Sequence, residues 1–182
     1  MKATKKLFLI IAMFTLGLTA MSARDNLIVE GSFAKIQGVK RMNLNIDWSY
    51  LHIDGHTPRE WIDVRNNEQP QYDAERELEK ELKVRWLDLV TTSNEKLNKK
   101  QFFLLPYSTE EDYTLTITPH QVDRRGNLEA FCTITNGDDE VVVKFVLTGK
   151  GGVFGTMGNL WGDGFKSAGK NLAKIIEKFL VK

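Results

Sequence analysis

Alternating apolar and polar residues mark most of the predicted strands. The clearest case is residues 40–53, where Asn43, Asn45, Asp47 and Ser49 share one face. The opposite face carries Leu44, Ile46, Trp48, Tyr50 and His52. Such period-two alternation indicates a strand with one buried and one solvent-facing side. Further strands are predicted over residues 27–36, 101–106, 113–122, 128–135 and 141–148, and Asn136-Gly137 predicts a tight hairpin turn between the last two.

Two stretches instead repeat apolar residues every three or four positions, as one face of a helix requires. In residues 71–98 this face is Ala74, Leu78, Leu82, Trp86, Leu89, Ser93 and Leu97. In residues 163–180 it is Phe165, Ala168, Leu172, Ile175, Ile176 and Phe179. Strands and helices do not alternate regularly. The order therefore predicts an α+β fold, a two-layer domain with a mostly antiparallel sheet of about five to six strands and two long helices on one face.

The N-terminal segment has the pattern of a secretory signal peptide. Lys2, Lys5 and Lys6 precede an apolar run over residues 7–18, and Ser22-Ala23 supplies small residues for cleavage. An apolar run of this length is too short for a membrane span. We expect residues 1–23 to be a signal peptide and residues 24–182 to form one domain, exported to the periplasm or outside the cell, with no transmembrane segment.

Charge and cysteine content exclude several classes of protein. Removal of the three signal-segment lysines takes the 25 basic residues to 22 against 24 acidic ones, a balance that does not favour nucleic acid as a partner. Cys132 is the single cysteine, so no internal disulfide can form. Its alternation with Ala130 and Ile134 predicts a buried apolar position in a strand.

No motif predicts catalysis, a metal site or a cofactor. His52 and His56 flank Asp54-Gly55, which ends a strand, whereas two metal-binding histidines at this spacing work best on one helix face. The segment 164–170 matches the first part of a phosphate-binding loop, but Asn171 follows where Ser or Thr is needed. We therefore expect a protein that is not an enzyme.

The stretch 149–182 is the candidate functional region. Eight of the 14 glycines lie between Gly149 and Gly169, in a connection predicted over residues 149–164 that is unusually apolar. Candidate contact residues are Phe154, Met157, Leu160 and Trp161, with Phe154 and Trp161 as aromatic anchors. Lysines then recur every fourth residue, at Lys166, Lys170, Lys174 and Lys178. They form either a solvated face or a contact for an anionic partner.

The arrangement also resembles a known group of proteins. The features that match are Gly31-Ser32-Phe33, Ile46-Asp47-Trp48-Ser49, Ile53-Asp54-Gly55, the charged helix that follows and the glycine-rich segment before the last helix. In these the chain resembles uncharacterised secreted proteins of Gram-negative, Bacteroidetes-type gut and oral bacteria. More broadly, it is similar to small envelope α/β proteins that serve as accessory subunits of outer-membrane assemblies and transporters. The resemblance implies a location and a fold class but no catalytic residues.

Together these patterns lead to one main hypothesis. We expect a non-catalytic envelope protein that binds a protein partner or an anionic membrane surface through the glycine-rich loop and the lysine-bearing helix. A small-molecule or lipid carrier, with a pocket between helix 71–98 and the sheet, is the alternative. A secreted hydrolase is a third interpretation, which lacks an evident nucleophile or metal set.

Overall fold

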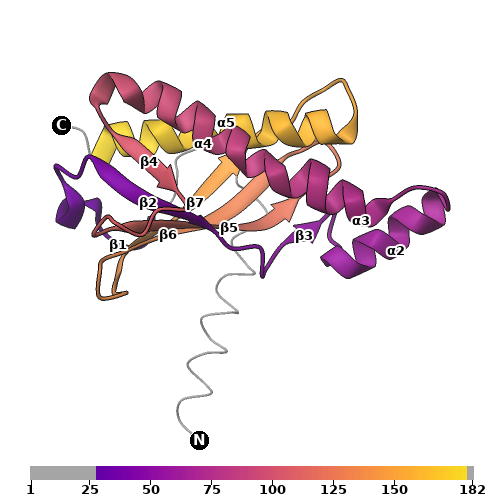
Figure 1. Ribbon diagram of the computed structural model, residues 1–182, viewed down its shortest axis with the longest axis horizontal. Coiled ribbons are helices and arrows are strands. Elements are labelled where there is room, and N and C mark those ends of the chain that lie inside the picture. The colour runs from indigo at the N-terminus through magenta and orange to yellow at the C-terminus, as the bar shows by residue number, and fades with distance from the viewer. Residues whose placement is uncertain (1–27, 180–182) are drawn as a thin grey trace, which may run out of the picture.

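The computed structural model describes residues 28–179, so the predicted signal peptide at residues 1–23 lies outside the described residues. The fold is mixed α/β, with a seven-stranded sheet and helices packed on it (Figure 1). The strands are β1 (Ile28–Gly31), β2 (Arg41–Ile46), β3 (His52–Ile53), β4 (Phe103–Pro106), β5 (Thr114–Val122), β6 (Leu128–Thr135) and β7 (Val141–Gly149). The helices are α2 (Pro58–Glu68), α3 (Ala74–Arg76), α4 (Trp86–Leu97) and α5 (Met157–Phe179). Short helical turns are η2 (Phe33–Ile36), η3 (Glu77–Leu82), η4 (Lys83–Arg85) and η5 (Asn98–Lys100).

The sheet mixes strand directions, which corrects part of the prediction. Its order is β1-β7-β6-β5-β2-β4, and β3 pairs with β5 beyond the end of β2. β5, β6, β7 and β1 pair antiparallel as expected, but β2 is parallel to both β4 and β5. Residue periodicity does not encode strand direction. The helical stretch between β2 and β4 provides the long crossover that parallel strands need.

Two predicted strands are shorter than expected. β1 ends at Gly31, and Ser32 then starts η2 because its hydroxyl accepts a hydrogen bond from the Ala34 N–H. The predicted strand 40–53 is divided into β2 and β3. The Asp47 carboxylate accepts bonds from the backbone N–H and the hydroxyl of Ser49, and such a local turn competes with strand pairing.

The predicted helix 71–98 is helical throughout most of its length but not regular. α3 is followed by the π-helical η3, the 3-10 turn η4 and then α4. A further helix, α2, lies between the predicted strand 40–53 and the predicted helix 71–98, where we predicted no helix or strand. Thr57 and Glu60 form a reciprocal cap at its start, with Pro58 in the first turn. This Thr-Pro-Arg-Glu signature is visible in the sequence and predicts a helix start.

α5 begins at Met157, earlier than the predicted start at residue 163. Glycines along α5 lie close to neighbouring elements. A Cβ atom on Gly158 would lie 2.7 Å from Glu81 Oε2, at the movable end of that side chain. One on Gly169 would lie 2.5 Å from the backbone carbonyl oxygen of Leu89, which leaves no room for it. α4 and α5 therefore lie side by side above the sheet, as Figure 1 shows. The glycine-rich segment is mainly a packing device and only partly a loop.

A side-chain amide closes the outer edge of β4, the last strand of the sheet. Asn94 on α4 donates to the Leu104 carbonyl at 2.8 Å and accepts from the Leu104 N–H at 2.9 Å. The Phe102 N–H donates to the Leu97 carbonyl, and Pro106 has no N–H. An edge with its polar groups occupied in this way is protected against pairing with another chain.

Candidate binding surface

The loop between β7 and α5 carries the two most exposed apolar side chains of the described region. Val153 is 80% exposed and Phe154 is 89% exposed. The stem of this loop is fixed, because the Lys150 N–H donates to Ser167 Oγ and the Gly151 N–H donates to Asn127 Oδ1. In Figure 1 the loop rises beyond the N-terminal end of α5, on the side away from the sheet. Its tip therefore presents Val153 and Phe154 to solvent.

The predicted row of lysines lies on the outer face of α5. Lys166, Lys170, Lys174 and Lys178 are all exposed, while the opposite face of the helix is buried in the core. Within residues 28–179, none of the four forms an ion pair. Their charges are therefore available to an anionic surface or partner.

Trp161 is not an exposed anchor, which corrects the sequence prediction. It is completely buried, and its Nε1–H donates to the Asp123 carbonyl at 3.0 Å. Met157 and Leu160 are half-buried. The earlier start of α5 explains the difference, because it places Trp161 on the same helix face as Phe165 and Ala168. Of the apolar candidates, Phe154 is the one that the structure fully exposes.

The cysteine, the histidines and the segment 164–170 each take part in packing or in secondary structure. Cys132 is buried, and burial raises the pKa of its thiol. His52 and His120 form an edge-to-face ring contact with centroids 5.8 Å apart, and His56 closes a turn with Ile53. The segment 164–170 is helical rather than a loop. Over residues 28–179, no group of three or more His, Cys, Asp or Glu side chains is placed to hold a metal ion.

The interface between the helices and the sheet is filled by side chains. Leu82, Leu89, Phe165 and Leu172 are each 0% exposed. They occupy the region in which the carrier hypothesis placed a pocket. Among the described residues, no helix is both long enough and apolar enough to cross a membrane.

A buried ion pair that no sequence pattern predicts joins α2 to η3. Arg65 and Glu77 are 8% and 2% exposed, and the guanidinium donates to both carboxylate oxygens at 3.2 and 3.3 Å. Tyr72 donates a third bond to Glu77 Oε1 at 3.0 Å. Because separation of a buried pair leaves an uncompensated charge, this contact holds the two helical segments together.

Arg124, in the turn between β5 and β6, extends this network to the sheet. It donates to Glu68 at 2.7 Å and to Asp54 at 2.8 Å. The guanidinium groups of Arg124 and Arg65 lie 5.0 and 5.8 Å from the centre of the Trp61 ring. These contacts attach α2 to the rest of the fold.

Acid should weaken this attachment. Hydrogen bonds from Arg124 and Arg65 lower the pKa of Glu68 to about 2 from an ordinary value of 4.5. Ionised Glu68 therefore stabilises the fold above pH 4.5, and this contribution is lost as the pH falls towards 2. In urea titrations, wild type should be more stable than Glu68→Gln at pH 6, and the difference should shrink steadily below pH 4.5. A difference independent of pH would show that Glu68 does not act through its charge.

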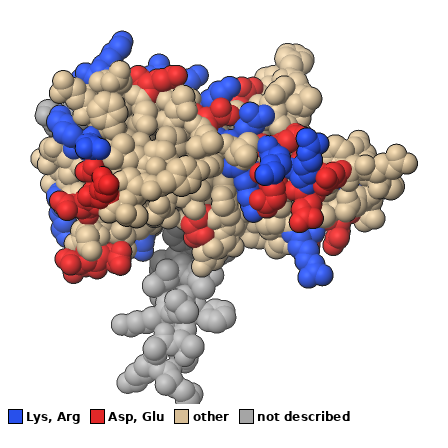
Figure 2. All heavy atoms as spheres, viewed as in Figure 1, with Lys and Arg blue, Asp and Glu red and all other residues tan. Residues whose placement is uncertain are grey.

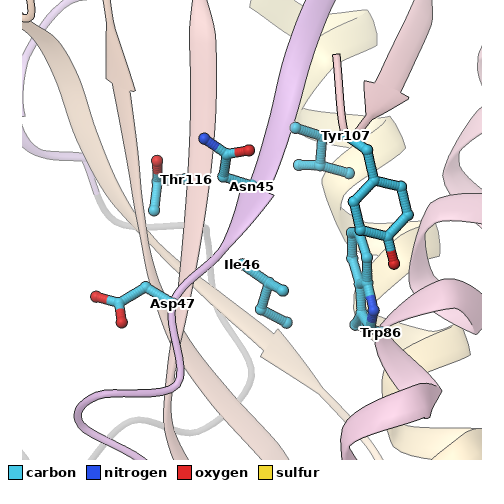
Figure 3. A pocket seen from close by; sticks show the side chains of 7 residues that line it. Asn45, Ile46, Asp47, Trp86, Tyr107 and Thr116 are labelled. Carbon is cyan, nitrogen blue, oxygen red and sulfur yellow. The ribbon is translucent and has the colours of Figure 1, made fainter. Parts of the chain in front are cut away.

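A groove of about 380 Å³ lies where β2 ends beside α4 (Figure 3). Its lining consists of Leu44, Asn45, Ile46, Asp47, Trp86, Tyr107 and Thr116. The Trp86 and Tyr107 rings pack edge to face with centroids 5.3 Å apart, and Tyr107 is 78% exposed. Figure 2 shows mixed charges over α3 and η3, whereas the face over β2 and β4 is largely uncharged. Apart from Asp47, which lines it, the groove therefore opens on a part of the surface with few charges.

Comparison with known proteins finds distant likenesses of structure. The PelC dodecamer from Paraburkholderia phytofirmans aligns with a TM-score of 0.41 at 9% identity, covering 87% of this chain and 99% of that chain. A single-residue variant of the same dodecamer gives 0.40 at 12% identity, with 87% and 100% covered. A crystal structure of an uncharacterized protein gives 0.39 at 13% identity, with 76% and 99% covered.

No family model matches the chain, and no curated protein matches it. TM-scores near 0.4 at such low identity do not establish a shared function. We therefore base the functional proposal on this chain's own residues.

Proposed function

We propose that the protein is a non-catalytic protein of the cell envelope that attaches to an anionic membrane surface through α5 and the loop before it. The observation that carries this proposal is the pair Val153 and Phe154, 80% and 89% exposed on a loop with a fixed stem. The helix that follows carries four exposed lysines that form no ion pair within residues 28–179. Apolar side chains at a membrane interface, flanked by lysines that meet anionic headgroups, are the usual elements of peripheral attachment. The signal-peptide pattern at residues 1–23 supports export.

The expected energies are large enough to give measurable binding. Burial of a Val or Phe side chain contributes about 1.5–3 kcal/mol. Each lysine near an anionic surface contributes about 1 kcal/mol, and salt screens this contribution. Attachment should therefore need both the loop and the lysine row, and should weaken as salt is added.

Vesicle binding tests the proposal. The purified protein should sediment with vesicles that contain phosphatidylglycerol and much less with vesicles of phosphatidylcholine alone. Replacement of Lys166, Lys170, Lys174 and Lys178 by Gln should weaken binding by at least about tenfold. Phe154→Ser should also weaken it, because the serine side chain removes the apolar surface that would enter the interface.

A matched variant separates a specific surface from net charge. Lys35, Lys96, Lys99 and Lys100 are also exposed, and their replacement by Gln changes the net charge equally. This control should bind as wild type does. Equal loss in both quadruple variants would contradict a specific surface. A different result would be that wild type binds neither kind of vesicle but crosslinks to one envelope protein in intact cells. If Phe154→Ser then abolishes that crosslink, the surface binds a protein instead.

A further inference from the structure

Because β4 ends first, the last part of β2 has no neighbouring strand on its outer side. The pairing of β2 with β4 runs from Arg41↔Phe103 to Leu44↔Pro106, and β2 continues to Ile46. Tyr107 then turns the chain away, in the left-handed conformation with φ of 63°. Beyond Leu44, the outer side of β2 therefore faces the groove rather than another strand.

The hydrogen-bond pattern shows which backbone groups point into this opening. The Asn43 N–H donates to the carbonyl of Tyr113, the residue just before β5. The Asp47 N–H donates to the Ile117 carbonyl on β5. In a strand, the N–H and C=O of alternate residues point to opposite edges. The N–H and C=O of Ile46 therefore point away from β5, towards the position that β4 would occupy if it continued past Pro106.

This opening differs from the closed edge one strand further out. On β4, Asn94 occupies both polar groups of Leu104. Natural sheets usually blunt or cover their free edges, because an uncovered edge recruits another strand. Here the outermost strand is covered, and the shorter edge of β2 at Ile46 is left beside a groove.

The two sides of the groove differ in chemistry, as Figure 3 shows. Ile46, Trp86 and Tyr107 lie on one side of β2, and Asn45, Asp47 and Thr116 lie on the other. Asp47 accepts both bonds from Ser49 through one oxygen, and these bonds lower the pKa of its carboxyl, which keeps it ionised near neutral pH. An added strand would place successive side chains on the two sides in turn. One side favours an apolar residue and the other a basic residue.

We propose that the free edge of β2 at Ile46 binds an extended segment of a partner polypeptide, which pairs with the Ile46 backbone. Its apolar side chain packs against Trp86 and Tyr107, and the next side chain, Lys or Arg, meets Asp47. This is strand addition, in which main-chain bonds supply affinity and alternate side chains supply specificity. The site is separate from α5 and does not depend on the proposed membrane attachment.

The probe is the synthetic peptide Ac-Thr-Lys-Val-Lys-Val-Thr-NH2, titrated into the ¹⁵N-labelled protein. In the free protein the Ile46 amide should exchange rapidly with solvent. The peptide should slow that exchange and shift the Ile46 and Trp86 resonances. A version methylated on the two valine nitrogens keeps the side chains but loses main-chain donors, and it should bind at least about tenfold more weakly.

Three protein variants test the two sides of the groove. Asp47→Asn should weaken binding and reduce its salt dependence, and Tyr107→Asn, which tolerates the left-handed backbone, should weaken it several-fold. Val141→Asn alters an exposed residue on β7, which β5 and β6 separate from β2, and should bind as wild type does.

Three outcomes would overturn the proposal. The first is an Ile46 amide already protected in the free, dilute protein. The second is equal affinity for the methylated and unmethylated peptides. The third is protection that grows with protein concentration in the absence of peptide, because the occupant is then a second copy of this chain.

Discussion

Gly164→Ala should lower the free energy of unfolding by about 3 kcal/mol, although alanine is the better helix former. In α5, helix propensity alone favours alanine over glycine by about 1 kcal/mol. The added Cβ atom, however, would lie 1.7 Å from the Gly126 carbonyl oxygen. That oxygen belongs to the backbone of the turn between β5 and β6 and has no side-chain freedom to move aside. α5 and the turn must separate, and urea unfolding measures the loss.

Gly137→Ala is the matched control for this effect. A Cβ atom there would have its nearest neighbour, the Asp112 carbonyl oxygen, at an ordinary 3.8 Å. Its free energy of unfolding should stay within about 0.5 kcal/mol of wild type. A Gly164→Ala protein that is as stable as wild type, or more stable, would show that α5 does not approach the turn as closely as described.

Trp161→Ala should lower the free energy of unfolding by about 3–5 kcal/mol. The indole is completely buried between α5 and the sheet, and its removal leaves a cavity. The Asp123 carbonyl also loses the indole donor. Trp161→Phe keeps most of the apolar volume and should cost less, about 1–3 kcal/mol, mainly for the unpaired carbonyl.

Phe154→Ala is the matched comparison for Trp161→Ala. Both residues were candidates for aromatic anchors, but Phe154 is 89% exposed. Its replacement should change the stability by less than about 0.5 kcal/mol. The two variants should therefore differ in which property they lose. Trp161→Ala should lose stability, whereas Phe154→Ala should stay stable but bind vesicles poorly. Similar stability losses in both would contradict the burial of Trp161 and the exposure of Phe154.

Local patterns predict those parts of the fold that depend on neighbouring residues. Alternation and the Asn136-Gly137 turn correctly predict the strands β5, β6 and β7, and the buried position of Cys132 follows from the same alternation. The lysine row is exposed on a helix face, as its spacing allows. What periodicity cannot give is strand direction, which depends on the crossover between β2 and β4.

The remaining differences come from contacts between distant residues. Glycine is a poor helix former, so the start of α5 at Met157 is hidden from propensity arguments. It becomes favourable because Gly158 and Gly169 allow close packing. The groove is equally hidden, because Ile46, Trp86 and Tyr107 are far apart in the sequence. By contrast, the reciprocal cap of α2 is a local pattern, Thr57-Pro58-Arg59-Glu60, from which the start of this helix is predictable.

The pairing of β1 with β7 has a consequence for how the chain reaches its fold. The first described strand joins the last, and an ion pair between Glu30 and Lys144 links residues 114 positions apart. Loop-closure entropy makes such long-range pairings slow to form. A growing chain that has not yet reached residue 145 cannot complete this edge of the sheet. We therefore expect this edge of the sheet to close late, with β1 unpaired until β7 is available.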